Sequence, residues 1–540
     1  MNLPRPELSV GEALVGLLES YGVDTIFGIP GVHNVEMYRA LPRSKIRHIL
    51  PRHEQGAGFM ADGYARVTGK PGVCFTITGP GLTNILTPMG QAYSDSSPLL
   101  VISSSLDIGD SAQGRGRLHE MRSQLNVAQS VTPNARHATT ASDVRDVMAE
   151  AFASFATSRP RPYYLEIPVD LLKSPAGAGW QARPLPRRPS PHGDLIEEAV
   201  SLLARARQPV MILGGGATGC SSAARKIAEA IGAVVMTSTA GKGIFPESHP
   251  LSAGYHLSRT GAKSLISECD VLLAVGTELS ETDFWDGYRI DAELIGVSGK
   301  LIRIDLDPSS IVRPHVPHLA ILSDASEALN AIAERIPATV VKSTPFGAAT
   351  AQALRDAENH SDFRVSMRRI LDVIRAALPP ETIVASDMTQ IAYAANEDFP
   401  VDLPRKWLHP VGFGTLGFAL PAAIGAKFGD GKTPVACLVG DYGLQYTINE
   451  LGTAVEHRLP IPILLWNNNA LGQIRDDMVD KGIQPNAVTL RNPDFQILAK
   501  AYGCAAAKPK NLGDLASAIA AALKADGPTL IEMTPQMALV

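Results

Sequence analysis

Cysteine, aromatic residues and long hydrophobic runs are all scarce in this chain of 540 residues. The 5 cysteines are scattered and form no CxxC pair, which argues against a disulfide framework or a zinc ribbon and favours a reducing compartment, the cytoplasm. The longest apolar runs, such as residues 271–275 and 462–466, are too short to span a bilayer, and the first residues lack the apolar segment of a secretory signal. Because aromatics are only 6% while glycines number 47 and prolines 40, the composition suits an α/β enzyme better than a fibre or a coiled coil.

No sign of charge dominates either. Lys and Arg total 49 against 54 for Asp and Glu, a formal net charge of −5, so there is no bulk electrostatic case for nucleic acid or an anionic membrane as a partner. The chain is 45% hydrophobic and 19% charged, which is enough apolar material for several buried cores. At roughly 150 residues per domain, the length predicts three or four domains.

Two segments have the composition of linkers. Residues 174–193 hold several prolines, glycines and arginines, and residues 344–361 are alanine-rich and polar between two helical patterns. They divide the chain into an N-terminal domain over 1–175, a central domain over 190–340 and a C-terminal domain over 360–540, each of ordinary domain size.

Each third alternates short apolar runs with helical patterns. The runs predict buried strands at 25–29, 73–78, 99–103, 163–167, 209–213, 234–237, 271–275, 301–304, 383–386, 435–439, 461–466 and 529–533. Helical patterns lie between them, for example at 144–156, 194–206 and 511–523. We therefore predict an α/β fold of three domains, each with a mainly parallel sheet flanked by helices, and we expect ligands beyond the C-terminal ends of strands.

An aspartate and an asparagine follow two successive predicted strands in the last third. Asp441 follows the run 435–439, and the pair Asn467-Asn468 follows the run 461–466. Side chains at these two strand ends can converge on one hard cation such as Mg²⁺, while the glycines around Asp441 let backbone N–H groups approach a phosphate. Ordinary strand-to-loop turns also favour Gly, Asp and Asn, so either half alone would be weak evidence.

Together the two halves match the thiamine-diphosphate signature, GDG followed after about twenty-five residues by NN. Tyr442 departs from this signature, but Gly443 follows it immediately. A second motif, residues 52–66 around Glu54, resembles the catalytic-glutamate helix of the acetolactate synthase group of thiamine-diphosphate enzymes. Residues 28–31, 78–84 and 412–426 resemble further active-site loops of that group, so the resemblance covers nearly the whole chain in order.

The resemblance implies a pyrimidine-binding N-terminal domain, a diphosphate-binding C-terminal domain, a small-molecule 2-oxo acid as substrate, and a homodimer or homotetramer with active sites between subunits. Glu54 would bond the aminopyrimidine ring and promote loss of the thiazolium proton. Mg²⁺ would be held by Asp441, Asn468 and the carbonyl of Ala470. The residues expected to bind thiamine diphosphate are Pro30, Gly79, Asn84, Thr389, Gln390, Gly414, Leu416, Asp441, Tyr442, Gly443, Asn468 and Leu471.

Three departures from the acetolactate synthase pattern argue against acetolactate synthesis and against FAD. His119 lies in Leu-His-Glu where those enzymes have Phe-Gln-Glu, and Ser105 replaces a glutamine. The stretch 276–279 lacks their Arg-Phe-Asp-Asp-Arg run, which lies near the flavin. We therefore expect the central domain to bind no dinucleotide, although its Gly214-Gly215-Gly216 turn is a weak dinucleotide signal.

The segment after Asn468 bears on the substrate. Gln473 and Asp477 are spaced i, i+4 and share one helix face, next to an apolar stripe formed by Leu471, Ile474 and Met478. Asp477 replaces an acetolactate-synthase tryptophan, and an acid there would repel a second 2-oxo acid and attract a cationic tail; a plainly solvated face is equally compatible with the neighbouring acids.

The chain also resembles the 5-guanidino-2-oxopentanoate decarboxylases, through residues 30–33 and 440–446. A guanidinium tail prefers a carboxylate partner, which fits Asp477, and Val32 is expected beside the substrate. His33, His119 and Gln473 are the candidate catalytic residues besides Glu54, because histidine exchanges protons near neutral pH. Structural roles for both histidines stay equally open.

Non-oxidative decarboxylation of a 2-oxo acid with a polar or basic tail is therefore the predicted activity. Carboligation of 2-oxo acids is the alternative within the same family. A dinucleotide-dependent oxidoreductase built on the central domain would leave Glu54 and the Asp441/Asn468 pair without a role. A non-catalytic assembly subunit would tolerate loss of the Glu54 carboxylate.

Overall fold

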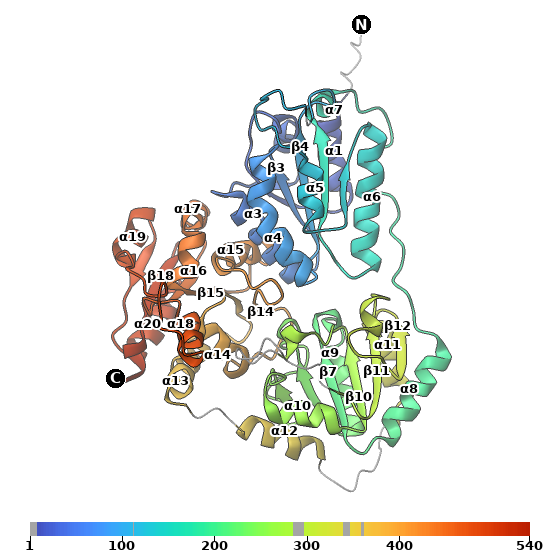
Figure 1. The fold of residues 1–540 in the computed structure, drawn as a ribbon, viewed down its shortest axis with the longest axis vertical. Helices are drawn as coiled ribbons and strands as arrows, with labels where there is room; N and C mark the ends of the chain where they lie inside the picture. The colour runs from blue at the N-terminus through green and yellow to red at the C-terminus, as the bar shows by residue number, and fades with distance from the viewer. Residues whose placement is uncertain (1–7, 112, 285–295, 338–345, 358–360, 540) are drawn as a thin grey trace.

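The computed structural model describes residues 8–111, 113–284, 296–337, 346–357 and 361–539. It contains three six-stranded sheets, one for each third of the chain, and every strand pairing in them is parallel (Figure 1). Helices cover both faces of each sheet, so the predicted fold class is confirmed. No helix among the described residues is both long and apolar enough to cross a membrane.

The N-terminal sheet has the strand order β2-β1-β3-β4-β6-β5. Its strands are β1 Thr25–Gly28, β2 Arg47–Ile49, β3 Gly72–Thr76, β4 Leu99–Ser105, β5 Ala135–His137 and β6 Tyr163–Pro168. Its helices are α1 Val10–Ser20, α2 Val35–Tyr38, α3 Glu54–Thr68, α4 Pro80–Ser94, α5 Gln124–Gln129, α6 Ala141–Thr157 and α7 Val169–Lys173.

The central sheet has the order β12-β11-β10-β7-β8-β9. Its strands are β7 Pro209–Leu213, β8 Val234–Thr237, β9 Ser252–Gly254, β10 Val271–Val275, β11 Lys300–Asp305 and β12 Leu319–Leu322. The helices around it are α8 Gly193–Arg205, α9 Ser221–Ile231, α10 Thr260–Glu268, α11 Ala325–Arg335 and α12 Phe346–Asp356.

The C-terminal sheet has the order β14-β13-β15-β16-β18-β17. Its strands are β13 Ile383–Ser386, β14 Trp407–Leu408, β15 Val435–Gly440, β16 Pro462–Trp466, β17 Ala505–Ala507 and β18 Thr529–Met533. Its helices are α13 Asp362–Ala377, α14 Gln390–Asp398, α15 Ala419–Gly429, α16 Asp441–Tyr446, α17 Leu451–Glu456, α18 Gly472–Asp480, α19 Phe495–Tyr502 and α20 Leu512–Ala522.

Alternate residues of the N-terminal strands enter two different cores. Phe27 and Cys74 face a core that continues into the C-terminal domain, whereas Ile26 and Val73 face α1 and α6 on the other side of the sheet. This period of two is expected of strands that are buried on both faces, and it explains why the strands read as continuous apolar runs.

Helices α3 and α15 cross where the N-terminal and C-terminal domains meet. A Cβ atom on Gly63 of α3 would lie 2.2 Å from the carbonyl oxygen of Ala422, and one on Gly425 of α15 would lie 1.8 Å from that of Met60. Both distances are far inside van der Waals contact, so the two backbones approach closely only because these positions carry no side chain. The crossing buries a core shared by both domains.

One predicted linker is wrong. Residues 346–356, expected to be a connecting segment, form α12, which packs on the central sheet through Ala351 and Leu354. Alanine is the strongest helix former, so the same composition that suggested a polar connection stabilises a helix once one face is buried. Residues 174–192, in contrast, join α7 to α8 without forming a helix or a strand.

Replacing Gly425 with alanine tests the helix crossing. The new Cβ atom would overlap a backbone carbonyl that cannot turn away, so Gly425→Ala is expected to lower the free energy of unfolding by about 3 kcal/mol or more. Gly16→Ala is the matched control, since α1 leaves open space at that glycine and the change should stabilise by about 0.4–1 kcal/mol. Chemical denaturation of both variants measures the difference, and equal stabilities would contradict the close crossing.

Candidate active site

Polar loops gather at the C-terminal edge of the N-terminal sheet. His33 follows β1, Glu54 follows β2, Gly79 follows β3 and His119 follows β4. Because parallel strands end at the same edge, residues from four separate stretches of sequence come to one side of the domain.

Glu54 is the first residue of α3 and is buried, with 8% of its surface exposed. Asn84, in the second turn of α4, donates a hydrogen bond from Nδ2 to Oε2 of Glu54 at 2.9 Å. His53 caps the helix, accepting a hydrogen bond at Nδ1 from the backbone N–H of Gln55. The Glu54 carboxylate is therefore fixed at a helix N-terminus, where the helix dipole favours negative charge.

His33 and His119 form a pair. Their rings are 5.1 Å apart and nearly perpendicular, and the Nδ1 atom of each is buried without a hydrogen-bond partner among the described residues. Burial, and then the neighbouring His119, lowers the pKa of His33. His119 has a φ of +65°, and its carbonyl oxygen lies 2.7 Å from where a Cβ on Gly79 would be. A strained residue packed on a glycine loop is a common feature of functional sites.

Asp441 begins α16 in the C-terminal domain and is 2% exposed. Its Oδ2 atom accepts a hydrogen bond from Nδ2 of Asn492 at 2.7 Å, and the same Nδ2 is 2.9 Å from Oδ1 of Asn467 and 3.3 Å from Oδ1 of Asn469. Three oxygens thus converge on one donor. Burial raises the pKa of Asp441. Asn492 was missed from the sequence because it lies far along the chain, before α19, with no motif of its own.

Asn468, the other side chain predicted to bind Mg²⁺, follows Asn467 in the loop after β16. Its Nδ2 donates to Oε1 of Gln390 at 3.0 Å, and its Oδ1 accepts from the backbone N–H of Ala470 at 3.1 Å. Gln390 in turn donates to Asp476 at 2.8 Å. The structure therefore brings Gln390, Asn468 and Ala470 together, beside the asparagine cluster around Asp441.

The donor set at Asp441 fits a hard cation. Among the described residues, no group of three or more His, Cys, Asp or Glu side chains could hold a metal, so a cation here would depend on one carboxylate with amide and backbone oxygens. That is the oxygen-only chemistry which Mg²⁺ prefers when phosphate oxygens complete its shell.

The loop between β14 and α15 carries Gly414 and Leu416. Gly414 and Gly417 have φ values of +65° and +85°, which only glycine adopts readily, and Leu416 is partly exposed rather than packed in a core. Asp387, fully buried, accepts hydrogen bonds from the N–H groups of Met388 at 2.8 Å and Gly417 at 2.9 Å. The buried carboxylate holds the glycine loop in place beside Thr389 and Gln390.

The same loop is also held by α4 of the N-terminal domain. Asp95, just after α4, accepts hydrogen bonds from the N–H groups of Val411 at 3.2 Å and Gly412 at 2.7 Å. Gln91 accepts one from the Thr415 hydroxyl at 2.8 Å. One end of α4 therefore contacts Glu54 through Asn84, while the other end fixes the loop that carries Leu416.

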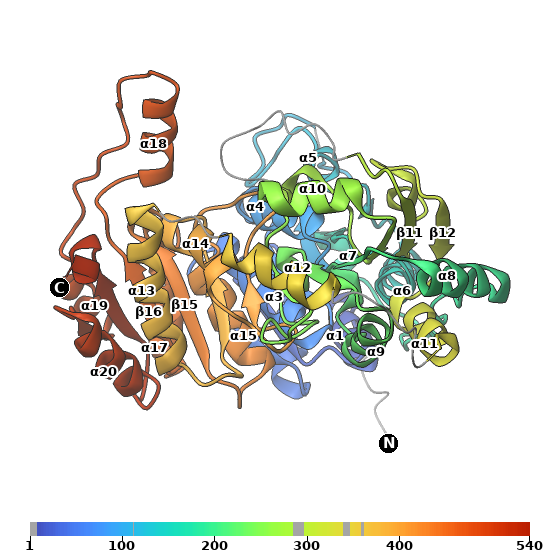
Figure 2. The same ribbon diagram turned by 90° about the horizontal axis from the view of Figure 1, so that it is seen from below.

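Helix α18 carries the predicted specificity residue. Gln473 donates from Nε2 to Oδ1 of Asp477 at 3.0 Å, so the two side chains share a face as expected. The helix projects away from its own domain (Figure 2), and Gly472 is its only buried residue. The predicted apolar stripe is therefore only partly covered by its own chain: Leu471 and Met478 are half-buried, and Ile474 is 47% exposed.

The two clusters remain separate within one chain. Among the described residues, no hydrogen bond or ion pair joins Glu54, His33 or His119 to Asp441, Asn468 or Asp477.

The remaining predicted residues lie beside these clusters. Gly443 packs its backbone against Asp387, and the ring of Tyr442 lies edge to face with that of Tyr446, 5.4 Å between ring centres. Pro30 and Val32 lie on the loop of His33, and Leu471 precedes α18.

A cavity of about 810 Å³ lies at the C-terminal edge of the central sheet, and residues of all three domains line it. The N–H groups of Gly214 and Gly216 are bonded to the carbonyls of Val275 and Gly276, so these amides are not free to bind a dinucleotide diphosphate. That the chain binds no FAD stays a prediction.

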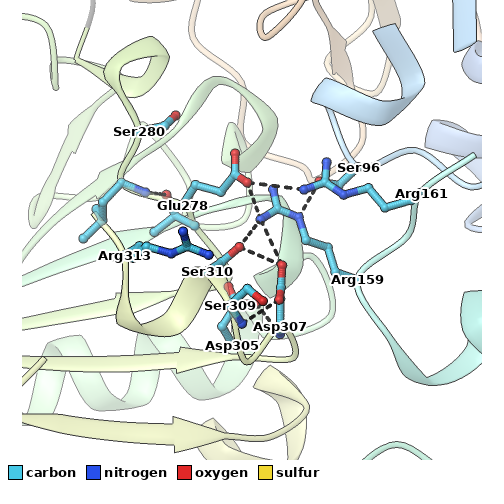
Figure 3. A network of polar contacts seen from close by, with 12 residues as sticks. Ser96, Arg159, Arg161, Glu278, Ser280, Asp305, Asp307, Ser309, Ser310 and Arg313 are labelled. Atoms are coloured by element: carbon cyan, nitrogen blue, oxygen red, sulfur yellow. Dashed lines mark hydrogen bonds and ion pairs between the residues drawn. The ribbon is translucent and has the colours of Figure 1, made fainter. Parts of the chain in front are cut away.

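A polar network bridges the N-terminal and central domains beside this cavity (Figure 3). Arg159, from the loop before β6, forms an ion pair with Glu278 and donates to Ser310 at 2.8 Å and to Ser96 at 2.8 Å. Arg161 lies 3.5 Å from the same glutamate. The network fixes the N-terminal domain against the loops that follow β10 and β11.

Polar loops at the strand ends of the first and third sheets thus form two candidate halves of one site in a three-domain α/β fold. The chain matches family models for the thiamine pyrophosphate enzyme N-terminal TPP binding domain over residues 8–127, the central domain over 196–332 and the C-terminal TPP binding domain over 387–533. The chain belongs to the thiamine pyrophosphate enzyme family.

Three individual proteins show the range of similarity. A probable 2-ketoarginine decarboxylase, AruI, of Pseudomonas aeruginosa is 46% identical, over 98% of this chain and 94% of that one. The acetolactate synthase large subunit of Corynebacterium glutamicum is 32% identical, over 98% and 87%. A putative thiamin diphosphate-dependent enzyme from Mycobacterium smegmatis shares the fold, with a TM-score of 0.84, 24% identity and coverage of 98% and 99%.

The carboxyl of Asp387 gives the site loop a pH-dependent stability. Burial raises its pKa from 3.8 to about 6, so between these values the native protein holds a proton that the unfolded chain has lost. Its contribution to stability is therefore full below pH 3.8 and falls as pH rises through 6. Asp387→Asn removes this slope, and the free energy of unfolding of the variant relative to the parent should rise by up to about 3 kcal/mol between pH 4 and 7.

Urea denaturation at a series of pH values measures this difference, in which the titration of all other groups cancels. Asp526→Asn is the control, because that side chain is 82% exposed and its replacement should leave the pH dependence unchanged. A difference between Asp387→Asn and the parent that is constant with pH would contradict the prediction.

Proposed function

We propose that this protein decarboxylates 5-guanidino-2-oxopentanoate, also called 2-ketoarginine, to CO₂ and 4-guanidinobutanal with thiamine diphosphate and Mg²⁺. The observation that carries the proposal is the 46% identity to the probable 2-ketoarginine decarboxylase AruI along nearly the whole of both chains. The 5 buried free cysteines fit a cytoplasmic, reducing location.

Mg²⁺ would be held by Asp441 with Asn468 and the carbonyl of Ala470, and the glycine backbone at Gly443 would approach the diphosphate. When bound, thiamine diphosphate supplies a nucleophilic carbon and an electron sink for the bond that releases CO₂. Leu416, partly exposed on a loop fixed by Asp387, would support the cofactor. Gly414 would accept a hydrogen bond at its carbonyl, which the positive φ of that glycine orients.

Glu54 would exchange a proton with the aminopyrimidine ring. Its Oε2 is engaged by Asn84, so Oε1 is the atom that would face the ring. The carboxylate is buried at a helix N-terminus and cannot turn without breaking that hydrogen bond. Pro30 and Gly79 lie on the neighbouring loops that would enclose the ring.

His33 and His119 would deliver the proton that replaces CO₂ on the product carbon. Their rings lie edge to face, and the Nδ1 atom of each has no hydrogen-bond partner among the described residues, so each has a ring nitrogen available to the substrate. Val32, on the same loop, would contact the substrate, and Gln473 would approach it from α18.

Asp477 would bind the guanidinium tail of the substrate. A carboxylate pairs with guanidinium through charge-assisted hydrogen bonds, and the bond from Gln473 orients the Asp477 oxygens. Pyruvate has no cationic tail, so it would form no ion pair with the Asp477 carboxylate. Carboligation, the activity of the acetolactate synthase relative, remains the second candidate because the chain shares the whole fold with it.

A second copy of the chain would complete the site. Exposed apolar side chains lie on the loops of the site and on α18: Val32 and Leu118 on the loops of His33 and His119, Phe413 on the loop of Leu416, and Ile474 and Val479 on α18. Val32 is 66% exposed and Val479 57%, which is costly for such residues in water. We infer a homodimer, or a tetramer built from it, in which Glu54 of one subunit faces Asp441 of its partner.

Measuring CO₂ release tests the activity. With Mg²⁺ and thiamine diphosphate, the protein should strongly prefer 5-guanidino-2-oxopentanoate to pyruvate and yield 4-guanidinobutanal. Asp477→Ala should reduce the ratio of the two kcat/KM values by about 10-fold to 100-fold, the loss of one charge-assisted contact.

Asp480→Ala is the control, since this exposed acid lies on the same helix and its loss should leave the ratio unchanged. A ratio unaffected by Asp477→Ala would remove that residue from the substrate site. Preference for pyruvate, with acetolactate or acetoin among the products, would make carboligation the function.

Mixing two inactive variants tests the shared site. Glu54→Gln and Asp441→Asn should each lose nearly all activity. If sites form between subunits, random pairing makes about half of the dimers hybrid, each with one intact site, so co-expressed chains should regain about a quarter of the parent activity. No recovery, with hybrid dimers shown by mass spectrometry, would mean that each chain builds its own site.

A further inference from the structure

Glu450 is a buried carboxylate at the boundary between the C-terminal and N-terminal domains. It ends the short helix Ile448–Glu450, and 0% of its surface is exposed. Its Oε1 atom accepts hydrogen bonds from the backbone N–H groups of Arg52 at 3.0 Å and His53 at 3.1 Å, and its Oε2 atom is 3.1 Å from the Arg52 nitrogen. One side chain of the third domain thus binds two successive amides of the first.

These two amides immediately precede Glu54. The chain turns from β2 into α3 at this point, with His53 as the helix cap. Glu450 also fills the space along the first turn of α3, because a Cβ on Gly56 would lie 2.2 Å from its Oε1 atom. Asn84 holds the Glu54 side chain, while Glu450 holds the backbone from which that side chain starts.

Within its own domain, Glu450 also accepts hydrogen bonds from the Thr453 hydroxyl at 2.7 Å and from Nδ2 of Asn449 at 3.0 Å. Among the described residues Glu450 has no salt-bridge partner, since the Arg52 guanidinium pairs with the exposed Glu456 instead. A buried carboxylate without a cation is costly, and an apolar residue of similar volume would pack the boundary at lower cost. Burial raises the pKa of Glu450 to about 7, which reflects the same cost. An apolar residue, however, could not accept hydrogen bonds from the backbone N–H groups of Arg52 and His53.

We propose that Glu450 is a positioning residue for Glu54: its carboxylate sets the backbone of the turn at residues 52–53 and thereby the placement of the Glu54 carboxylate against the cofactor. This inference rests on the proposed function, in which Glu54 exchanges a proton with the aminopyrimidine. A side chain displaced by about 1 Å can slow a reaction about 100-fold, so a change in this turn should be seen at the step that Glu54 assists.

The test is the exchange of the thiazolium C2 proton for deuterium in protein saturated with thiamine diphosphate and Mg²⁺, without substrate, followed by acid quench and NMR. Glu450→Gln keeps the volume but replaces one acceptor oxygen by a donor. We expect exchange about 10-fold to 100-fold slower than in the parent, a matching fall in kcat, and little change in the KM of the 2-oxo acid. Hydrogen exchange of the amides at 52–56 in the cofactor-free protein should be faster.

Glu456→Gln is the matched control, because it removes the exposed ion pair with the same Arg52 and leaves the backbone bonds intact. Its exchange rates should equal those of the parent. Glu450→Asp, which keeps the charge on a shorter side chain, gives a second variant if Glu450→Gln does not fold, and it too should slow C2 exchange.

The C2-exchange rates distinguish failure of the Glu450 positioning role from failure of the proposed function. If the parent accelerates C2 exchange and Glu450→Gln at full cofactor occupancy does so equally, the positioning role is wrong while the proposed function stands. If the parent itself gives no acceleration over free thiamine diphosphate, the proposed function fails and the role of Glu450 fails with it. The identity of the 2-oxo acid does not enter the exchange measurement.

Discussion

The close crossing of α3 and α15 is the contact on which the rest of the site depends. The two helices meet backbone to backbone at Gly63 and Gly425, and the apolar core beneath them runs without interruption from the N-terminal sheet to the C-terminal sheet. Since α3 begins with Glu54, the position of that carboxylate is set by how tightly two domains pack. Protein interiors are packed about as densely as organic crystals, so a shift of one helix also moves the side chains that are packed against it.

Buried carboxylates fix the loops that this packing brings together. Asp387, Asp95 and Glu450 each accept hydrogen bonds from backbone N–H groups of a loop of the candidate active site, and two of the three do so across a domain boundary. Backbone amides must be satisfied wherever they are buried, and a carboxylate satisfies two at once. The loops are thereby held without a strand or helix of their own.

The sequence predicted the inner strands of every sheet and missed the edges. All predicted runs correspond to strands flanked on both sides, whereas the missed strands β2, β5, β9, β12, β14 and β17 each lie at the end of a sheet. An edge strand is short and partly exposed, as Arg47–Ile49 and Ala505–Ala507 show, so it leaves no continuous apolar run to detect. Parallel pairing of such strands is decided by tertiary contacts alone.

For the site, local motifs were informative and long-range partners were not. The turns around Glu54 and Asp441 could be read from neighbouring residues, because the backbone shape at each depends on its own sequence. Asn492 and Glu450 reach these turns across 51 and 398 positions of chain, and nothing local marks them. The pairing of Gln473 with Asp477 on α18 was predicted from their spacing, but the projection of that helix from its domain depends on tertiary structure that the spacing does not encode.

Helix α18 can change in sequence with little effect on the folding of its domain. Within its own chain it buries only Gly472, so its side chains contribute little to the free energy that holds the C-terminal domain together. Most mutations at a binding surface are constrained by the stability they remove, but those at Ile474, Asp477 or Val479 are largely free of that constraint. Substitutions on this projecting helix can therefore accumulate while the glycine crossing and the buried carboxylates at the domain boundary stay the same.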